Sequence, residues 1–255
     1  KLEKKEGVAI ITFNAPQKLN ALTTGLRKSI IQSSEEVARD DEIKVVVVTG
    51  NGRGFCSGAD LSSNRGGTPT LNQRLEVLGP SYGAERYFSM DKPVIAAVNG
   101  ICVGAGFSLA LSMDLRIASQ DARFGAAFVL RGLVPDCGIT YWLPRTVGTS
   151  KALELMWTGR IIDAQEALKL GIVSQVVPPE QLMPLALEMA GKIAKQPPIP
   201  VELTKRIVYR TMNDDFWRHL DLETYAQQIC SPSEDAREAI SAFLQKRPPA
   251  PFKGR

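Results

Sequence analysis

Apolar residues gather in short continuous runs along this chain, and each run ends in turn-forming residues. The run at 7–13 is rich in β-branched residues and ends at a turn marked by Asn14 and Pro16. The runs at 44–50 and 92–100 are nearly free of polar residues and end in glycine. Such runs are typical of strands that are buried on both faces of a parallel sheet. We therefore predict strands at all three places.

Segments with helical spacing follow these runs. From Thr23 to about Asp40, the apolar residues Leu26, Ile30 and Val37 fall on one stripe, which predicts an amphipathic helix. Later segments predict a helix at 107–113 and short strands at 114–119, 122–128 and 171–177. Strand, loop and helix therefore alternate, which is typical of an α/β fold.

The last quarter of the chain has a different pattern. Predicted strands stop after 171–177, and the proline-rich stretch 196–200 predicts a boundary between two parts of the chain. Helical patterns then follow at 201–212, 215–229 and 233–247, with Ser233 as the expected N-cap of the last helix. We predict two parts, a core at 1–195 and a helical region at 196–255.

Composition narrows the class of protein. The apolar fraction of 44% and the charged fraction of 23% are those of a soluble globular protein, and no apolar run approaches the roughly 20 residues that span a membrane. The N-terminal stretch leads directly into a strand-like run, so we expect a cytoplasmic protein without a secretory signal. The net charge of +4 is scattered, which suits an anionic small molecule and indicates neither nucleic acid nor membrane as a partner.

Cysteine and histidine usage excludes several chemistries. The four cysteines (Cys56, Cys102, Cys137 and Cys230) have no C-x-x-C spacing, so we expect free thiols and no structural metal. The single histidine, His219, lies in a helical segment and is expected to be structural. Ser-His-Asp and Cys-His mechanisms would have to use this one residue, and a histidine-rich metal site is impossible.

Two glycine-rich loops follow the predicted central strands, at 49–61 and 99–110. Neither contains the Lys-Ser/Thr of a phosphate-binding loop, and Phe55 occupies the third glycine position of a dinucleotide fingerprint. The second loop leads directly into a helix, whose first N–H groups point at whatever lies in front of them. Two such loops side by side could each direct one backbone N–H at a shared oxygen, forming an oxyanion hole. Tight turns that need glycine are the alternative.

Asp136 stands alone in the segment "RGLVPDCGITYW" at 131–142. An ionised carboxylate among apolar neighbours is costly unless something holds it. Asp136 is therefore either the N-cap of a helix that begins near Cys137 or the working group of an active site. If it is buried among Val134, Pro135, Phe128 and Trp142, its pKa should be raised, which suits a group that takes and returns a proton.

Several segments resemble the crotonase, or enoyl-CoA hydratase/isomerase, superfamily in order along the chain. They are "NAPQKLNAL", "GRGFCSGADL", "KPVIAAVNGICVGAGFSLALSMDLRIAS", "FGAAFVLRGLVPDCG", "TGRIIDAQEALKLGIVSQVV" and "AISAFLQKRPPAPFKG". The resemblance covers nearly the whole chain. It implies an α/β spiral of ββα repeats, a C-terminal helical trimerisation region, a homotrimer or hexamer, and an acyl-CoA thioester as substrate. Coenzyme A belongs to that substrate, so neither a further cofactor nor a metal is expected.

The resemblance also implies positions for the site. The oxyanion-hole donors would be the backbone N–H groups of Ala59 and Ala105. The residues expected to contact substrate or CoA are Lys18, Leu19, Ser57, Ala59, Asp60, Leu61, Gly104 and Phe128, together with Phe243 and Lys246, which often come from a neighbouring subunit. Asp60 is also expected to brace its loop. The segments 62–80 and 81–91 would shape the acyl pocket, in which Glu85 or Asp91 could be a second acid and Tyr82, Tyr87 or Phe88 could form a wall.

The resemblance departs from the hydratase pattern at two positions. Hydratases of the family carry two catalytic glutamates where this chain has Ser108 and Phe128. The segment "GLVPDCG" resembles instead a subgroup in which an aspartate carries the chemistry, including the isomerase of ring-epoxidised phenylacetyl-CoA. We therefore expect an enoyl-CoA isomerase in which Asp136 moves the proton.

Other functions remain open. A hydratase would use Asp136 alone to activate water, and an aryl-CoA dehalogenase or hydrolase would use Asp136 as a nucleophile, in that subgroup together with a histidine. A serine peptidase of the Clp type would need a histidine within the core, where this chain has none. A CoA-binding protein without activity is the remaining alternative.

Overall fold

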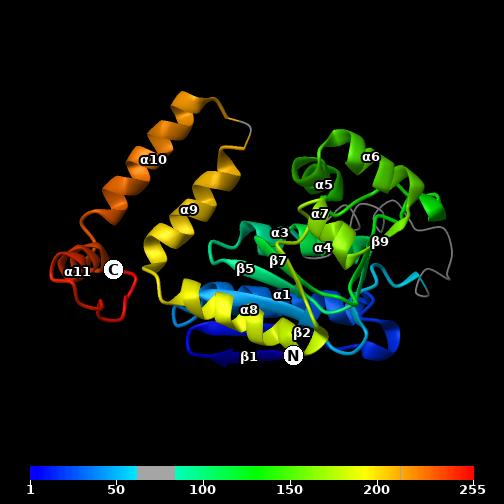
Figure 1. Cartoon of the computed structure of the whole chain (residues 1–255), viewed down its shortest axis with the longest axis horizontal. Coiled ribbons are helices and arrows are strands. Elements are labelled where there is room, and N and C mark those ends of the chain that lie inside the picture. The colour runs from blue at the N-terminus through cyan, green and yellow to red at the C-terminus, as the bar shows by residue number, and fades with distance from the viewer. Residues whose placement is uncertain (62–83, 213) are drawn as a thin grey trace.

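The computed structural model describes residues 1–61, 84–212 and 214–255 (Figure 1). Its main sheet has six strands in the order β1 (Leu2–Lys5), β2 (Val8–Phe13), β3 (Val45–Gly50), β5 (Val94–Val98), β7 (Leu115–Ser119) and β10 (Gln175–Val177). Only the β1–β2 pair is antiparallel. A second sheet has the order β4 (Gly54–Cys56), β6 (Ile101–Val103), β8 (Arg123–Gly125) and β9 (Ile161–Asp163), with β8–β9 antiparallel.

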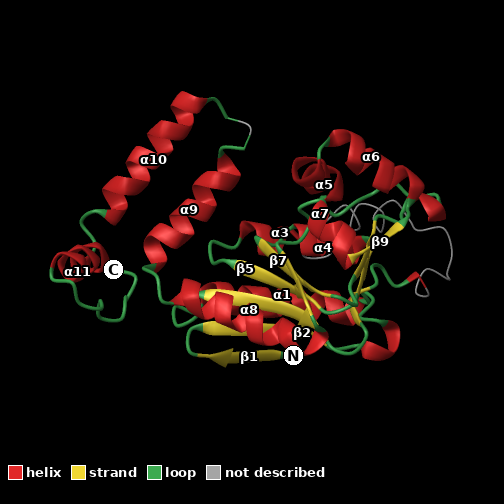
Figure 2. Cartoon of the chain, viewed as in Figure 1, coloured by secondary structure: helices red, strands yellow, loops and turns green. Residues whose placement is uncertain are grey.

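Helices surround the two sheets and make up the C-terminal part (Figure 2). Those in the core are α1 (Thr24–Arg39), α3 (Ala84–Ser89), α4 (Ala105–Leu111), α5 (Ile139–Val147), α6 (Thr149–Thr158), α7 (Ala164–Lys169) and α8 (Pro179–Ala194). Short 3-10 helices lie at η1 (Pro16–Lys18) and η3 (Val129–Arg131). The C-terminal helices are α9 (Pro198–Arg210), α10 (Phe216–Cys230) and α11 (Glu234–Leu244).

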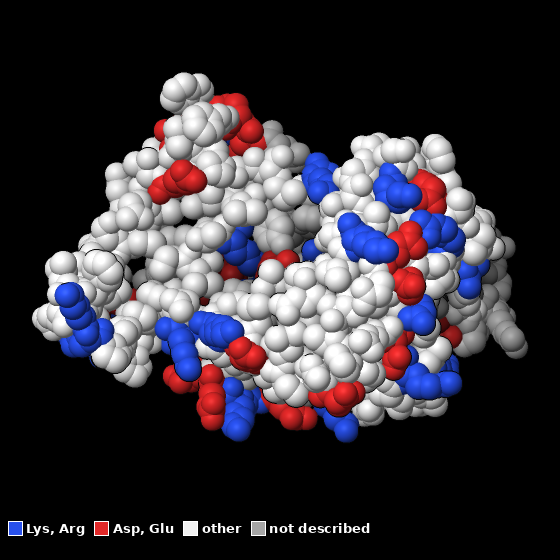
Figure 3. All heavy atoms as spheres, viewed as in Figure 1, with Lys and Arg blue, Asp and Glu red and all other residues white. Residues whose placement is uncertain are grey.

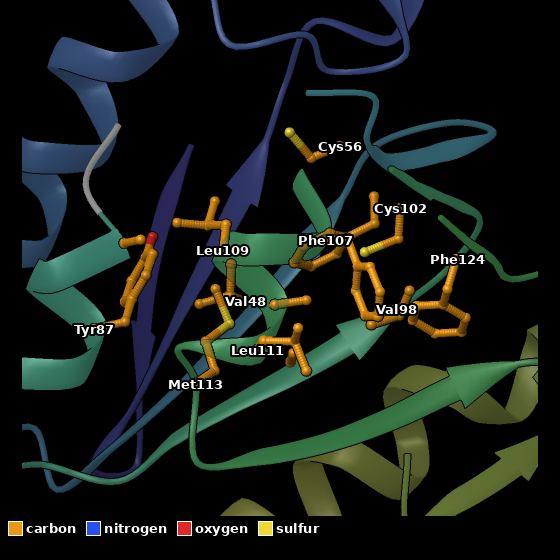
Figure 4. Packing of buried hydrophobic residues seen from close by; sticks show 14 of the residues in the cluster. Val48, Cys56, Tyr87, Val98, Cys102, Phe107, Leu109, Leu111, Met113 and Phe124 are labelled. Carbon is orange, nitrogen blue, oxygen red and sulfur yellow. The ribbon is translucent and has the colours of Figure 1, made fainter. Parts of the chain in front are cut away.

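The central strands are continuously apolar because both faces of the main sheet are covered. Val45 and Val47 of β3 pack on one face with Leu182 of α8, whereas Val46 and Val48 belong to the larger cluster on the other face. The same larger cluster contains side chains of α4 and of the main-sheet strands, whose packing is seen in Figure 4. The predicted burial of the strand at 44–50 on both faces is therefore confirmed.

Main-sheet strands continue into the second sheet through tight turns. β3 leads to β4, β5 leads to β6 and α4, and β7 leads to β8. Each of these three units has a strand in the main sheet followed by a short strand in the second sheet. In the β5–β6 unit, helix α4 starts shortly after the short strand. The predicted spiral of ββα repeats in an α/β fold is confirmed. Since parallel neighbouring strands end at the same edge of their sheet, the loops that follow β3 and β5 lie together.

The C-terminal helices project from the core, with α10 and α11 at the far end of the molecule from α4 and α6 (Figure 1). Lys205 of α9 fastens this region: its ammonium lies 2.8 Å from the Asp114 carboxylate and donates to the carbonyl oxygens of Tyr87 and Lys92. Ser233 caps α11 by accepting a 3.0 Å hydrogen bond from the Ala236 N–H, as predicted. The division at 195/196 itself stays a prediction.

Several elements differ from the sequence pattern. The strand expected at 171–177 covers only Gln175–Val177, and the strand expected at 122–128 covers only Arg123–Gly125. The helix α8 was not predicted, because Pro184 lies inside it, where proline disfavours a helix. Packing of its small side chains on the main sheet outweighs this local preference.

Candidate active site

The two glycine loops touch through their backbones. A Cβ atom added to Gly106, in the first turn of α4, would lie 2.1 Å from the carbonyl oxygen of Cys56 in the first loop. A Cβ added to Gly58 would lie 2.9 Å from the Val103 carbonyl oxygen, and Gly58 also has a left-handed φ of +88°. Glycine is required at both places, because any side chain would push the loops apart.

This contact brings Ala59 and Ala105 to the lining of one cavity. Ala105 is the first residue of α4, so its N–H has no acceptor within the helix. Among the residues that the structure describes, neither N–H donates to a backbone carbonyl. Both residues line a cavity of about 400 Å³. The arrangement provides two backbone donors in one hollow, which is what an oxyanion requires.

Three parts of the chain line this cavity. The glycine loops contribute residues 57–61 and 103–105. Helix α1 and the turn before it contribute Leu22, Thr24 and Arg27. The segment after β8 contributes Ala127, Phe128, Arg131, Leu133 and Asp136. Of the predicted contact residues, the cavity therefore unites Ser57, Ala59, Asp60, Leu61, Gly104, Ala105, Phe128 and Asp136.

Asp136 lies at the cavity, but it is not buried as the sequence suggested. The residue is exposed, and Val134, which was expected to cover it, is 77% exposed. The expectation of a buried carboxylate is therefore wrong. The physical reason is that residues 133–136 lie between Gly132 and Cys137, both of which have left-handed φ values, so this stretch turns outward over the cavity mouth.

Two buried side chains hold the backbone and carboxylate of Asp136. Ser108 of α4 is fully buried, and its hydroxyl donates a 2.9 Å hydrogen bond to the Asp136 carbonyl oxygen. The Cys137 thiol is buried and hydrogen-bonds to the Asp136 side chain; burial and this carboxylate raise the pKa of the thiol well above its ordinary value. The thiol therefore stays protonated and can donate to the carboxylate.

Asp136 does not cap the following helix. α5 begins at Ile139, its N-cap is Gly138, and no side chain caps it. The interpretation of Asp136 as an N-cap is therefore wrong. Because the carboxylate has no role at the helix end, its position at the cavity needs another explanation.

Lys18 and Leu19 pack against the first glycine loop. The Lys18 ammonium lies 2.9 Å from the Asp60 carboxylate, so this ion pair links the turn at Lys18 to the first loop. The Ser57 N–H donates to the Leu19 carbonyl at 3.0 Å, and its hydroxyl donates to the Lys18 carbonyl at 3.1 Å. The buried Asn20, which sequence analysis missed, holds this turn by donating to the carbonyl oxygens of Asn51 and Gly54.

Other predicted residues lie elsewhere in the chain. Phe243 is 82% exposed on α11, and neither it nor Lys246 lines the cavity within one copy of the chain. Asp91 pairs with Arg206, with a 3.0 Å hydrogen bond from the Arg206 Nε, so it is no acid in the cavity. Tyr82 lies outside the described residues.

The expected aromatic wall is instead part of the core. Tyr87 is fully buried, and Phe88 packs edge-on against Trp142 and Tyr209 with ring centroids 4.9 Å apart. His219 is structural, as expected: its ring nitrogens lie 2.7 Å from the Thr211 hydroxyl and 2.9 Å from a Glu223 carboxylate oxygen.

Glu85 has an unusual environment. Both of its carboxylate oxygens are buried and accept no hydrogen bond within the part of the chain that the structure describes. Its charge contributes to the raised pKa of the Cys137 thiol, and the Arg86 Nε lies 3.6 Å from one of its oxygens. Glu85 does not line the cavity.

A larger hollow of about 890 Å³ lies between α9 and α10, lined by residues such as Leu203, Val208 and His219. It contains none of the glycine-loop residues.

In the described parts of the chain, no three His, Cys, Asp or Glu side chains are grouped to hold a metal ion. None of the helices described here combines the length and apolar character that crossing a membrane requires. On the face seen in Figure 3, basic and acidic side chains are interspersed.

Comparisons with known proteins agree with this geometry. The family model described as enoyl-CoA hydratase/isomerase matches residues 3–255. The short-chain-enoyl-CoA hydratase of Clostridium acetobutylicum is 39% identical over 255 residues, covering 100% of this chain and 97% of that protein. The 1,2-epoxyphenylacetyl-CoA isomerase of Escherichia coli K12 is 37% identical over 249 residues, covering 96% of this chain and 95% of that protein.

A solved structure of similar sequence has the same fold. The crystal structure of enoyl-CoA hydratase from Bacillus anthracis superimposes with a TM-score of 0.94 at 34% identity, covering 100% of this chain and 99% of that one. A hydratase and an isomerase are thus similar to this chain to nearly the same degree, so overall similarity does not choose between the two reactions. The chain belongs to the enoyl-CoA hydratase/isomerase family.

Proposed function

We propose that this protein is an enoyl-CoA isomerase in which Asp136 moves one proton between two carbon atoms of an acyl-CoA. One observation carries the proposal: Asp136 lines the same cavity of about 400 Å³ as the Ala59 and Ala105 N–H groups. Asp60, the other carboxylate among the described lining residues, is paired with Lys18. Asp136 is therefore the acid–base candidate beside the two donors.

The proposed reaction needs one base and one oxyanion hole. The Asp136 carboxylate takes a proton from C2 of a 3-enoyl thioester, and the electrons move onto the thioester oxygen. The N–H groups of Ala59 and Ala105 stabilise this negative charge, which develops only as the proton leaves. The exposed Asp136 carboxyl group can exchange this proton with solvent before it returns a proton to C4, which leaves the double bond between C2 and C3. Coenzyme A is part of the substrate, and no other cofactor takes part.

Ser108 and Phe128 support isomerisation over two-carboxylate hydration. The Ser108 hydroxyl is occupied by the Asp136 carbonyl, and Phe128, which is 7% exposed, presents an apolar ring to the cavity. Neither side chain can deprotonate a water molecule. Proton transfer within the substrate does not need that water, so one carboxylate is sufficient.

The CoA part is proposed to lie along the first loop. Ser57, Leu61 and the Lys18–Leu19 turn lie on that side of the cavity. Phe243 and Lys246 would reach CoA from a neighbouring copy in a homotrimer or hexamer, because neither lines the cavity of its own chain and α11 lies at the far end of the molecule from α4 (Figure 1). The exposed aromatic residues of α10 and α11 support such an assembly.

Hydration of a trans-2-enoyl-CoA is the second candidate. The observation in its favour is the name of a similar protein, the short-chain-enoyl-CoA hydratase of Clostridium acetobutylicum. In this chain Asp136 would have to activate the water alone. The products of the two reactions differ in mass, because hydration adds a water molecule to the substrate and isomerisation does not.

Mass spectrometry in heavy water separates them. Wild type, Asp136→Asn and the surface control Asp121→Asn are incubated with a trans-2-enoyl-CoA and with a cis-3-enoyl-CoA. We expect double-bond migration and deuterium uptake without addition of water in wild type and Asp121→Asn, and loss of both by roughly 100-fold or more in Asp136→Asn. Rapid hydration that survives Asp136→Asn would contradict the proposal and direct attention to Glu85.

A further inference from the structure

The indole ring of Trp142 packs against the turn that carries Asp136. Trp142 is the fourth residue of α5, and its backbone N–H donates a 3.0 Å hydrogen bond to the Gly138 carbonyl oxygen. A Cβ atom added to Gly138 would lie 3.2 Å from the indole Nε1, so the ring itself contacts this residue. Gly138 is two residues after Asp136 in the chain. The indole therefore supports the turn directly.

The start of α5 also holds the backbone of Asp136. The Asp136 carbonyl oxygen accepts a 3.3 Å hydrogen bond from the Ile139 N–H, in addition to the 2.9 Å bond from the Ser108 hydroxyl. Ile139 is the first residue of α5 and is fully buried. The position of α5 therefore determines where the backbone of the proposed base lies.

Trp142 also contacts the C-terminal helical region. Its ring centroid lies 5.6 Å from that of Tyr209 on α9 and 4.9 Å from that of Phe88 on α3. Phe88 and Tyr209 in turn lie 4.9 Å apart, and all three pairs are edge-on. Each ring of this aromatic cluster (Phe88, Trp142 and Tyr209) thus contacts the other two. Because edge-on contacts depend on orientation, a shift of one ring disturbs both of its neighbours.

Tyr209 is fixed at its hydroxyl end. The hydroxyl donates a 2.8 Å hydrogen bond to one carboxylate oxygen of Asp114. The other oxygen of Asp114 accepts a 2.7 Å hydrogen bond from the Val94 N–H at the start of β5 and lies 2.8 Å from the buried Lys205 ammonium. Through Asp114, the Tyr209 ring is therefore held to the main sheet, and it provides a firm support for the indole.

We infer that Trp142 is a positioning residue, which couples the docking of α9 on the core to the position of the Asp136 carboxylate. This inference rests on the proposed function, because it takes Asp136 as the base. The segment 131–134 and Asp136 itself are exposed, so the loop has little packing of its own. A base on such a loop needs outside support, since a misplacement of about 1 Å can cost up to roughly 100-fold in rate.

A purely structural role of the aromatic cluster is the alternative. In that role, loss of a ring lowers the free energy of unfolding, but molecules that are still folded keep the wild-type kcat. A positioning role lowers kcat in molecules that are fully folded. The two roles are therefore distinguished by kcat values measured under conditions in which urea titrations show every variant to be folded.

The kinetic test uses wild type, Trp142→Leu, Tyr209→Leu, the double variant and the control Arg206→Gln. Arg206 also lies on α9, but it contacts Asp91 and belongs to no pair of the aromatic cluster. We expect each cluster variant to lose roughly 10-fold in kcat for a cis-3-enoyl-CoA with little change in KM. Arg206→Gln should equal wild type, and Trp142→Phe should recover most of the loss.

The double variant tests whether Tyr209 acts through Trp142. If it does, the double variant should have the kcat of Trp142→Leu, because the second substitution has no further contact to remove. Losses that multiply in the double variant would overturn the inference. An unchanged kcat in folded Trp142→Leu, or an equal loss in Arg206→Gln, would overturn it as well.

Hydrogen exchange tests the same support without any substrate. Peptides that span 133–142 contain the Ile139 amide, which donates to the Asp136 carbonyl. We expect this amide to exchange roughly 10-fold faster in Trp142→Leu and Tyr209→Leu, and at the wild-type rate in Arg206→Gln. Unchanged exchange in both cluster variants would overturn the inference. Absence of turnover together with the expected exchange would instead overturn the proposed isomerase activity and leave the support of Asp136 by Trp142 standing.

Discussion

The Ser108 hydroxyl on α4 donates a 2.9 Å hydrogen bond to the backbone carbonyl of Asp136. Ala105, whose N–H is a proposed oxyanion donor, begins the same helix three residues earlier. One buried bond thus links the loop that carries the proposed base to the helix that carries a proposed donor. At the position where the family resemblance implies a glutamate in hydratases, this chain has Ser108, whose side chain holds the backbone of the proposed catalytic aspartate.

Replacing Ser108 by alanine should therefore lower kcat more than it changes KM. Without the bond, Asp136 is no longer fixed relative to the oxyanion hole, and misplacement of a catalytic group by about 1 Å can cost up to roughly 100-fold in rate. We expect Ser108→Ala to lose roughly 10-fold in kcat, measured by steady-state deuterium exchange, and about 1 kcal/mol in the free energy of unfolding.

Ser112→Ala is the matched control for this prediction. Ser112 follows α4, is 2% exposed, and donates a 2.8 Å hydrogen bond to the Leu109 carbonyl, away from Asp136. Its loss should cost a similar amount of stability and leave kcat unchanged. Equal kcat values for the two variants would show that Ser108 has no positioning role.

Adding a methyl group at Gly106 should separate the two glycine loops. The new Cβ would lie 2.1 Å from the Cys56 carbonyl oxygen, so the loop or the helix has to move. We expect Gly106→Ala to lose at least roughly 100-fold in kcat/KM and to be destabilised by about 2 kcal/mol or more, measured by urea unfolding.

The same substitution at Gly191 provides the comparison. Gly191 lies within α8, and an added Cβ would meet nothing within 4 Å. Gly191→Ala should stabilise the protein by about 0.5–1 kcal/mol without affecting turnover, because alanine favours a helix more than glycine does. A normal activity of Gly106→Ala would contradict the close approach of the two loops.

Arg160 should make the stability depend on pH in the acid range. Its hydrogen bonds to Glu154 and Glu166 lower the pKa of both carboxyl groups, that of Glu154 from its ordinary 4.5 to about 2. A carboxyl group whose pKa is lowered by folding stabilises the folded state above the unfolded pKa. This contribution is present above about pH 4.5 and is lost as the pH falls towards 2.

Urea unfolding of wild type and Arg160→Gln between pH 6 and pH 2 checks this linkage. The gap in unfolding midpoint between the two proteins should narrow as the carboxyl groups are protonated, about from pH 4.5 downwards. Lys195→Gln, at an exposed lysine, serves as control. The difference between its unfolding midpoint and that of wild type should stay constant over the pH range. A constant gap for Arg160→Gln over the whole range would refute the prediction.

Exposed aromatic side chains on the C-terminal helices predict self-association. Phe216, Trp217 and Phe243 are 66%, 74% and 82% exposed in the single chain. Since large exposed apolar side chains are a mark of interfaces, we expect sedimentation velocity to give the mass of a trimer or hexamer. Trp217→Glu should shift the distribution to smaller species.

Trp157→Glu is the control, because Trp157 is 69% exposed on α6, outside the helical C-terminal region. It should leave the trimer intact. If Phe243 contacts CoA from a neighbouring copy, Phe243→Ala should raise KM while the assembly keeps its mass. A monomeric wild type with full activity would contradict both the assembly and the role of Phe243.

Local patterns predicted the parts of the fold whose environment is uniform. The strand at 44–50 could be recognised because both of its faces are apolar, and the helix at 23–40 because its stripe is regular. The helix α8 was missed because its prolines hide a stripe that only the main sheet explains. Arg27 was missed for a different reason. The apolar stripe of α1 does not show which end of the helix meets the cavity.

By itself the sequence determined the α/β repeats, the two glycine loops and Asp136 as the isolated acid, because these depend on residue type and spacing within short segments. The tertiary structure decided that Asp136 is exposed, that Ser108 and Cys137 hold it, and that Arg27 shares its cavity. These relationships join residues far apart in the chain. Their distances are set by the parallel order of β3 and β5 and by the backbone contact at Gly106, which no local pattern encodes.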